Sequence, residues 1–427
     1  MPEIKAFRGW RYNPSKNSDL SKVFAPPYDV ISPRQQKKLY EESPANVIRL
    51  ELGVDQPGDS TAQNKYTRAA DTLNDWKKNS TLLHENKPAL YVYVQDYREE
   101  GRNKTRLGFL SLMNIDEKVV KKHENTLAAP KEDRLKLLRA TRTNLSPIFG
   151  LFEDQKKIVN SYLKRSMKLN PSVDETIDDV RHRLFVETRE DFISGIADAM
   201  KAKTMYIADG HHRFETACNY KKESRIPGAG YVMTYFADSC NNPFKIFPTH
   251  RLIKVAGSKG WEKLAKLGIL EKAAGVEPLL AGLDTPREEV PGKPYDFGFY
   301  TKERARLPDG HGFYLFSMNR KAASRVKNNP VDRLDVAVLH RSILGPCFGV
   351  QKIEKSASID FTPDPKDAVG RVDHGIFDAA FFLRPTSLDE MILASKKGLK
   401  MPQKSTYFYP KLLSGLVFHS FEDGLQP

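Results

Sequence analysis

The chain has 427 residues, 40% of them hydrophobic and 29% charged, which is typical of a globular protein long enough for two or three domains. Its 68 Lys and Arg outnumber its 54 Asp and Glu, but the basic residues are scattered and form no zinc-finger or basic-zipper pattern. We therefore do not expect nucleic acid to be its partner, although the net charge of +14 leaves that class open. The three cysteines lie far apart, which excludes a disulfide framework or a zinc cage. No apolar run suits a signal peptide or a membrane span, so we expect a cytoplasmic protein without a membrane partner.

The first part of the chain is expected to carry a rigid loop, a helix and a strand. Pro26 and Pro27 stiffen the chain just before Asp29, and Ser32 followed by Pro33 predicts the start of a helix. Residues 47–52 alternate apolar and charged side chains, as a half-buried strand does. A stiff loop that holds an acid suits a functional site, but it is equally common as a structural corner.

The next part predicts a helix, a hairpin and then a polar segment. Residues 60–78 have an amphipathic helical pattern, and residues 89–97 and 105–113 read as two strands of a hairpin. A further helix is expected over residues 131–142. Lys131 and Arg134 lie three residues apart on it, so they could bind a phosphate together or belong to a solvated face.

The second half of the chain alternates strands and helices without a repeat or an obvious linker. We expect a helix over 189–201 and strands over 230–236, 294–300 and 313–318. A helix over 332–345 should end at the glycines and proline of 345–349, and the continuous apolar run at 379–383 predicts a central strand. Residues 398–411 are expected to form a loop that combines bases, hydroxyls and aromatic rings.

The stretch most suggestive of function is Asp209-Gly210-His211-His212-Arg213. Apolar residues 206–208 precede it and a helix-compatible run follows, so it reads as a strand, a tight turn and a helix start. Such a turn directs backbone N–H groups and the positive helix end at one place, which suits an anion. The alternative is a polar surface turn without a ligand.

This turn resembles the signature of the ParB/sulfiredoxin-like superfamily, and within it that of the free L-serine kinases. Segments at 26–32, 123–126, 130–134, 144–150 and 404–411 are similar to a longer branch of that group. The branch includes serine kinases that use inorganic pyrophosphate in place of a nucleotide. The segments span nearly the whole chain.

The resemblance implies a phosphotransferase that acts on an alcohol group, converting pyrophosphate and L-serine to phosphate and O-phospho-L-serine with Mg²⁺ as cofactor. His211, His212 and Arg213 would bind the phosphoryl group, and one imidazole would protonate the leaving phosphate. Asp209 would orient a histidine or bind Mg²⁺. The base toward the serine hydroxyl would be Glu124 or Asp29. The other residues expected to line the substrate pocket are His123, Thr126, Lys131, Asp133, Arg134, Ser146, Lys404, Ser405, Thr406 and Lys411.

The expected fold is mixed α+β, two-lobed, with a ParB-like core that carries the turn. We expect an N-terminal lobe over residues 1–190 and the core with a C-terminal lobe over 191–427. No Walker loop or protein-kinase glycine-rich loop occurs, which is consistent with a donor that is not a nucleotide. ADP or ATP as donor, a phosphoserine phosphatase, and a ParB-like DNA- or nucleotide-binding protein stay as alternatives.

Overall fold

The computed structural model describes residues 3–126, 128–254, 259–284, 295–302, 307, 310–350 and 358–424. It is a mixed α+β protein, as expected. The chain forms two compact units. The first unit comprises Met1–Lys122, Thr126–Phe244 and Pro410–Pro427, and the second comprises His123–Asn125 and Lys245–Tyr409. Residue 190, the expected boundary, lies inside the first unit, because the elements before and after it pack into the same core.

The first unit is built on a mixed nine-stranded sheet with the order β6-β11-β8-β12-β5-β4-β10-β9, to which β1 adds at β5. Its strands are β1 (Ile4–Lys5), β4 (Leu90–Glu99), β5 (Arg102–Asn114), β6 (Val120–Lys121), β8 (Ile148–Phe152), β9 (Val173–Ile177), β10 (Val180–Glu187), β11 (Met205–Asp209) and β12 (Tyr231–Asp238). Only β11 with β6 and β12 with β8 pair in parallel among these strands. The predicted hairpin is confirmed as β4 and β5.

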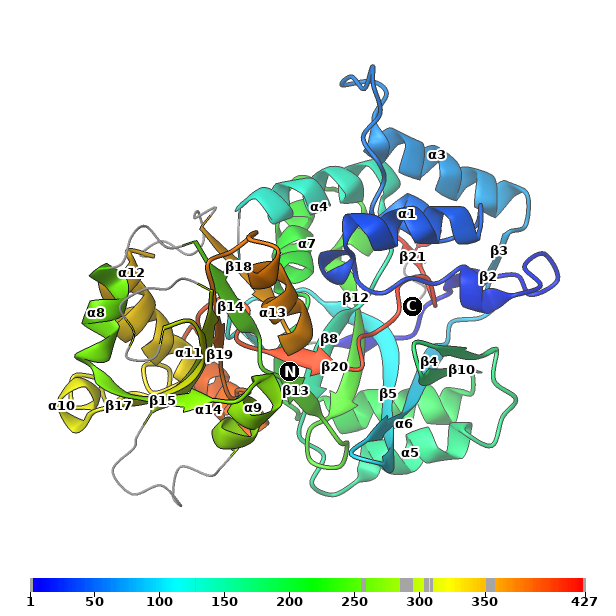
Figure 1. Cartoon of the computed structure of the whole chain (residues 1–427). Coiled ribbons are helices and arrows are strands. Elements are labelled where there is room, and N and C mark those ends of the chain that lie inside the picture. Colours follow the sequence, from blue (N-terminus) through cyan, green and yellow to red (C-terminus); the bar gives the residue numbers. More distant parts are fainter. Residues whose placement is uncertain are drawn as a thin grey trace. The chain divides into compact units, whose positions relative to one another are not determined.

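Helices of the first unit pack against one another, and some of them share an apolar core with the sheet. The helices are α1 (Pro33–Glu42), α2 (Ile48–Glu51), α3 (Lys65–Lys78), α4 (Ala128–Thr141), α5 (Ile158–Ser166), α6 (Glu190–Met200) and α7 (His211–Glu223). The side chains of α5, α6 and α7 enter one core with Phe109, Phe152 and Phe236 of the sheet. In Figure 1, α4 lies beside α7 and α3. The core therefore fixes where α7 begins, directly after β11.

Residues 47–52 do not form the expected strand. Residues Ile48–Glu51 are a single helical turn, α2, because Asn46 accepts a hydrogen bond from the backbone N–H of Ile48 at 2.9 Å and donates to Lys22 O at 2.7 Å. The turn buries Leu50 and also Glu51. The alternating pattern suggested a strand because it assumes that charged residues face solvent. Glu51 is instead buried, next to Arg134, which is distant in sequence.

The helix expected over 332–345 is less regular than predicted and lies three residues further along the chain. It consists of α11 (Asp335–Val338), the π-helix η5 (Leu339–Leu344) and α12 (Gly345–Phe348). Pro346 does not end it, because a proline in the first turn of α12 needs no N–H donor there. Gly349 ends it instead, with a φ of 73°.

The second unit contains a six-stranded antiparallel sheet with the order β15-β17-β16-β19-β14-β18. The strands are β14 (His250–Ile253), β15 (Gly268–Ala273), β16 (Asp296–Thr301), β17 (Gly312–Met318), β18 (Ile359–Thr362) and β19 (Ala379–Phe382). The predicted central strand is confirmed as β19, between β16 and β14; residue 294 of the predicted strand 294–300 lies outside the described residues. The helices are α8 (Lys259–Ala265), α9 (Val276–Asp284), α10 (Arg320–Ala323), α13 (Pro365–Asp373) and α14 (Leu388–Lys396). Within the expected 398–411 loop, β20 (Tyr407–Tyr409) pairs with β13 (Lys245–Phe247).

The C-terminal segment belongs to the first unit and is held there by backbone pairing. β21 (His419–Ser420) pairs with β7 (Thr143–Asn144), and isolated bridges join Ser414 to Ala25 and Phe418 to Trp10. None of the helices in the described part of the chain combines the length and the apolar character that a bilayer crossing requires.

Two buried histidines make the stability of the first unit sensitive to acid. Burial lowers the pKa of His182 and of His419 to about 3, whereas an unfolded histidine titrates near 6.5. Between these values the unfolded chain binds more protons, so the free energy of unfolding should fall as the pH falls below about 6.5. Each histidine contributes at most about 1.4 kcal/mol per pH unit.

His182→Gln should make this dependence shallower, because glutamine does not titrate and can still accept the 2.6 Å hydrogen bond of the Tyr93 hydroxyl. Urea unfolding at about pH 7 and about pH 5 measures the difference. The exposed His311→Gln serves as the control and should keep the wild-type dependence. An unchanged slope in His182→Gln would contradict the assignment.

Candidate functional site

The predicted strand, turn and helix at residues 205–223 are confirmed as β11, Gly210 and α7. Gly210 has a φ of +89°, a left-handed conformation that favours glycine. A Cβ at this position would also lie 3.1 Å from Cζ, Nε and Nη2 of Arg213. Two features therefore favour glycine at position 210: the left-handed backbone, and the Arg213 guanidinium, which packs where a Cβ would lie.

The N-terminus of α7 presents the residues that the turn was expected to carry. His211 is buried, and His212 and Arg213 are half-buried. Arg213 donates a hydrogen bond from Nη1 to the carbonyl oxygen of Pro147, which fixes its guanidinium. The first backbone N–H groups of an α-helix have no acceptor within the helix, and the helix dipole adds positive potential. An anion is the natural ligand of this geometry.

Asp209, at the end of β11, is paired with Lys411. Its Oδ1 accepts from the Gly210 N–H at 2.7 Å, and its Oδ2 lies 2.8 Å from Lys411 Nζ. The structure thus brings Lys411 to the turn, although it lies 202 residues away in sequence. The charge of Asp209 is balanced by a neighbouring cation.

A buried pair of side chains holds the backbone around Lys411. Gln95 donates to the carbonyl oxygen of Lys411 at 2.8 Å, and Arg106 donates to that of Pro410 and to Gln95 Oε1. The Arg106 guanidinium also lies over the ring of Phe149, 5.0 Å from its centroid. Gln95 and Arg106 were not predicted as site residues. They face each other across β4 and β5, and that pairing cannot be read from the sequence without the strand register.

Lys131 and Thr126 meet at Glu215 of α7. Glu215 accepts from the Thr126 hydroxyl and from Lys131 Nζ at 3.1 Å, and Lys122 Nζ lies 3.5 Å away. Burial alone would raise the pKa of Glu215, but these hydrogen bonds and the positive charges lower it below its usual value. Glu215 was missed, although its place two residues after Arg213 on the same helix is the signal that could have found it.

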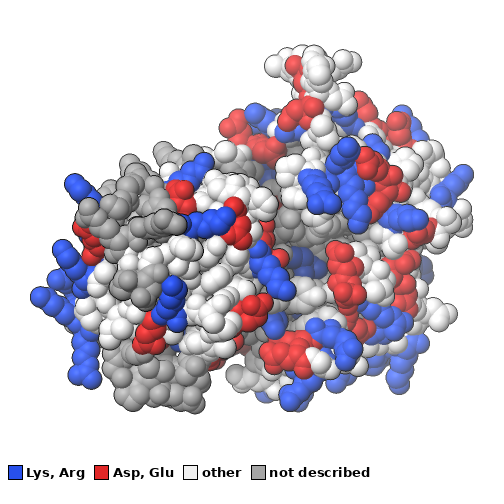
Figure 2. All heavy atoms as spheres, viewed as in Figure 1, with Lys and Arg blue, Asp and Glu red and all other residues white. Residues whose placement is uncertain are grey.

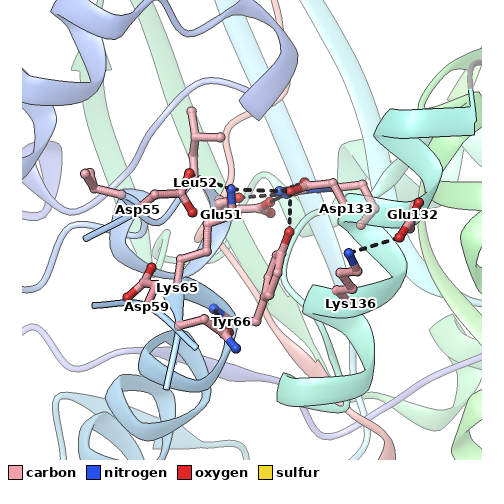
Figure 3. A network of polar contacts seen from close by, with 12 residues as sticks. Glu51, Leu52, Asp55, Asp59, Lys65, Tyr66, Glu132, Asp133 and Lys136 are labelled. Atoms are coloured by element: carbon pink, nitrogen blue, oxygen red, sulfur yellow. Dashed lines mark hydrogen bonds and ion pairs between the residues drawn. The ribbon is translucent and has the colours of Figure 1, made fainter. Parts of the chain in front are cut away.

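Arg134 and Asp133 form a second network, between α4 and the N-terminal helices (Figure 3). Arg134 Nη1 donates to the carbonyl oxygen of Glu51 at 2.7 Å and to its Oε2 at 3.2 Å, and Nε donates to Asp133 Oδ2 at 2.9 Å. Tyr66 donates to the other oxygen of Asp133 at 2.8 Å. Burial alone would raise the pKa of Asp133, but the charge and hydrogen bonds of Arg134 lower it. The two cations Lys131 and Arg134 therefore serve separate carboxylates.

A cavity of about 50 Å³ lies between α4, α7 and the segment that follows α4. Arg213 and Thr216 line it from α7, and Arg134 lines it from α4. The other polar lining residues are Glu51, Thr143, Asn144 and Ser146. The cavity thus joins three of the expected site residues, Arg134, Ser146 and Arg213.

Asp29, another expected acid of the first unit, does not line this cavity. Asp29 is exposed, in the 3-10 helix η2 (Tyr28–Val30). Its neighbour Tyr28 stacks against Arg134, with the guanidinium 4.2 Å from the ring centroid.

The second unit gathers His123, Glu124 and the 404–406 residues around one loop. Met401 N–H donates to His123 O at 2.7 Å, and Lys404 N–H donates to Glu124 Oε1 at 2.9 Å. Ser405 is buried and donates to the carbonyl oxygen of Pro402, while Thr406 is half-buried. Glu124 is thereby held by the backbone of the loop that sequence similarity grouped with it.

Arg251 holds the backbone of this loop through hydrogen bonds. It was not among the expected site residues. It is buried, and Nη2 donates to the carbonyl oxygens of Gln403 at 3.3 Å and Lys404 at 3.0 Å. Its Nε lies 3.1 Å from Nε2 of His340, in the π-helix η5. Burial lowers the pKa of Arg251 to about 9, and the charge of Glu124 opposes that shift.

Residues 4–337 match a family described as "Protein of unknown function (DUF1015)". The chain belongs to this family. A search of curated proteins found no match for this DUF1015 chain.

Solved structures resemble the DUF1015 chain only distantly. A "Conserved hypothetical protein from Pyrococcus furiosus" is 14% identical with a TM-score of 0.37, covering 74% of this chain and 96% of that one. A "Free serine kinase in complex with AMP" is 12% identical with a TM-score of 0.36, covering 70% and 86%. "SbnI with C-terminal truncation from Staphylococcus aureus" is 12% identical with a TM-score of 0.36, covering 71% and 85%. Likenesses of this strength carry no argument about activity.

Proposed function

We propose that this DUF1015 protein is a serine kinase that transfers a phosphoryl group from pyrophosphate to L-serine, releasing phosphate. The observation that carries the proposal is the turn at 209–213. It combines the N-terminal N–H groups of α7, two imidazoles and a guanidinium fixed by Pro147, and Lys411 lies beside it. Phosphoryl transfer is catalysed mainly by positioning and by positive groups around the phosphates, and this turn supplies both.

The proposed roles follow from this chemistry. The α7 N-terminus, Arg213 and Lys411 bind the phosphates, and His211 or His212 gives a proton to the phosphate that leaves. The serine Oγ forms the new P–O bond as its proton passes to a carboxylate. Glu124, whose carboxylate accepts a hydrogen bond from the Lys404 N–H, and Asp29 are the two candidates for this base.

Magnesium would serve this reaction by neutralising charge on the phosphates. Proteins bind Mg²⁺ through one or two carboxylates, with substrate phosphate oxygens and water as its other ligands. Asp209 at the turn is a ligand of this kind, and Lys411 Nζ, 2.8 Å from Oδ2, competes for the same carboxylate. Asp209 would hold Mg²⁺ only together with the phosphate oxygens of pyrophosphate.

³¹P NMR of the purified protein with Mg²⁺ and L-serine tests the proposal when pyrophosphate, ADP and ATP are supplied in turn. With pyrophosphate we expect its resonance to decline while those of phosphoserine and phosphate grow together. Phosphoserine formed only with ADP or ATP would overturn the donor. No phosphoserine with any donor would overturn the kinase, and hydrolysis of phosphoserine without pyrophosphate formation would indicate a phosphatase.

The net charge of +14 is the observation that favours DNA or nucleotide binding as a second candidate. Figure 2 shows Lys and Arg intermixed with Asp and Glu on the face that it draws. Surface pairs such as Arg139 with Glu223 and Arg181 with Asp174 balance basic charge locally. Salt-dependent binding of duplex DNA in a gel-shift assay would support this candidate instead.

A further inference from the structure

Three hydrogen bonds join the loop over residues 401–404 to the segment 123–125 of the second unit. Two of them reach backbone carbonyl oxygens of the segment, at 2.7 and 3.2 Å. The third runs from the Lys404 N–H to Oε1 of Glu124 at 2.9 Å. The position of the Glu124 carboxylate therefore depends on the direction in which the Lys404 N–H points.

That direction is set by the peptide unit between Gln403 and Lys404. The C=O and the N–H of a trans peptide lie in one plane and point in opposite directions. Arg251 Nη2 donates to the carbonyl oxygen of Gln403 at 3.3 Å and to that of Lys404 at 3.0 Å. Because both carbonyls are fixed against one guanidinium, the Lys404 N–H is directed away from Arg251 and toward Glu124.

The backbone of Lys404 needs support of this kind. Its φ is +53°, in the left-handed region that residues with a Cβ rarely adopt. Such a conformation persists only where the surrounding structure imposes it. The hydrogen bonds that Arg251 donates to the carbonyl oxygens on both sides of the Lys404 Cα supply that constraint.

Arg251 is itself held in place by buried partners. It is 1% exposed, its Nε donates to Nε2 of His340 at 3.1 Å, and its Nη1 donates to the carbonyl oxygen of Thr249. Burial lowers the pKa of His340 well below its usual value, so the ring stays neutral and can accept this hydrogen bond. His340 belongs to the π-helix η5, a distortion that is frequent at functional sites.

Packing alone does not explain a buried arginine at this position. A well-packed apolar side chain of similar volume often stabilises a protein as well as a buried charge does, or better. Among the described residues no carboxylate forms an ion pair with Arg251. Its place is explained instead by what it does for the backbone at Lys404 and, through it, for Glu124.

We propose that Arg251 is a positioning residue for Glu124, and that Glu124 is the base that takes the proton of the serine hydroxyl. The proton passes to the carboxylate as the serine Oγ forms its bond to phosphorus. The bridging P–O bond of pyrophosphate breaks in the same step, and its electron pair goes to the leaving phosphate. The inference rests on the proposed function and, within it, selects Glu124 rather than Asp29.

Arg251→Lys tests the inference, because lysine keeps a cation but loses the planar fork that binds two carbonyl oxygens and His340 at once. The kcat for phosphoserine formation from pyrophosphate should fall about 10- to 100-fold, as misplacing a catalytic group does. The KM for pyrophosphate should change less than about 2-fold, since Arg251 supports none of the groups proposed to bind it. In Glu124→Gln, which has already lost the base, adding Arg251→Lys should lower kcat no further.

Arg384→Lys is the matched control. Arg384 is another arginine of the second unit, with a side chain only 16% exposed, and it pairs with Asp296 at 3.3 Å. This variant should keep the wild-type kcat. A thermal unfolding scan verifies that each variant is folded. If Arg251→Lys does not fold, Arg251→Gln replaces it, because an amide can still donate to a carbonyl oxygen.

Hydrogen exchange of residues 401–406 gives a readout without turnover. In Arg251→Lys the Lys404 amide should exchange at least about 10-fold faster than in wild type, while the amides of β17 keep their rates. Unchanged exchange at Lys404, an unchanged kcat, or a kcat loss that adds to that of Glu124→Gln would each overturn the inference. If wild type forms no phosphoserine with any donor, the proposed function fails, whereas faster exchange at Lys404 would still show that Arg251 positions Glu124.

Discussion

His212→Ala is expected to lower phosphoserine formation at least about 100-fold, as the loss of a general acid or a phosphate-binding donor does. His212 is the second residue of α7, in the turn of the helix where backbone N–H groups and the dipole act on the same anion. It is half-buried, and alanine is the best helix former, so the free energy of unfolding should change by less than about 1 kcal/mol. The kcat with pyrophosphate, together with urea unfolding, measures both.

Lys222→Ala is the control, since Lys222 lies near the C-terminal end of the same helix with a side chain 70% exposed. It should keep the wild-type kcat. His212→Gln distinguishes two roles, because a glutamine can donate a hydrogen bond but cannot transfer a proton. A rate restored by Gln would assign His212 to phosphate binding alone. Wild-type kcat in His212→Ala would remove this residue from the site.

The β11–α7 connection was predictable from sequence because its determinants are local. An apolar run, a glycine and a helix-compatible segment suffice to predict strand, turn and helix, and Gly210 is left-handed as that order requires. Helix α2 was not predictable in this way. Its decisive partners, Val23 and Phe24 at its N-terminus and Arg134 at Glu51, are distant in sequence.

The site residues also divide into those with a local sequence signal and those whose role depends on partners distant in sequence. The resemblance named both Asp209 and Lys411 as site residues, because both belong to segments with recognisable composition, and the structure pairs them. Glu51 and Gln95 carry no such signal. Each is an ordinary polar residue in sequence, and its importance comes from being buried against a cation that a different strand or helix supplies.

Arg134→Met is expected to destabilise the first unit by about 3–5 kcal/mol, the cost of breaking a buried ion pair from one side. Methionine replaces most of the aliphatic volume but leaves Glu51, 3% exposed, and Asp133 without their shared cation. It also removes the guanidinium from the face of Tyr28. The free energy of unfolding in urea measures the loss.

The neighbouring Arg139 provides a control on the same helix. It pairs with Glu223 at 2.7 Å, but the two side chains are 50% and 38% exposed, so Arg139→Met should cost less than about 1 kcal/mol. If both variants lose the same free energy of unfolding, the buried network around Arg134 stabilises the protein no more than a surface ion pair does.

The double variant Glu51→Gln, Arg134→Met separates the pair from the packing around it. If the cost of Arg134→Met comes mainly from an uncompensated carboxylate, neutralising Glu51 in the same chain should recover at least about 1 kcal/mol, a coupling expected between residues in contact. If the cost comes instead from lost contacts with Tyr28 and Asp133, the two substitutions should add. Recovery would identify Glu51 as a charge that the fold tolerates only because Arg134 stands beside it. That dependence explains how the fold keeps a carboxylate that is only 3% exposed.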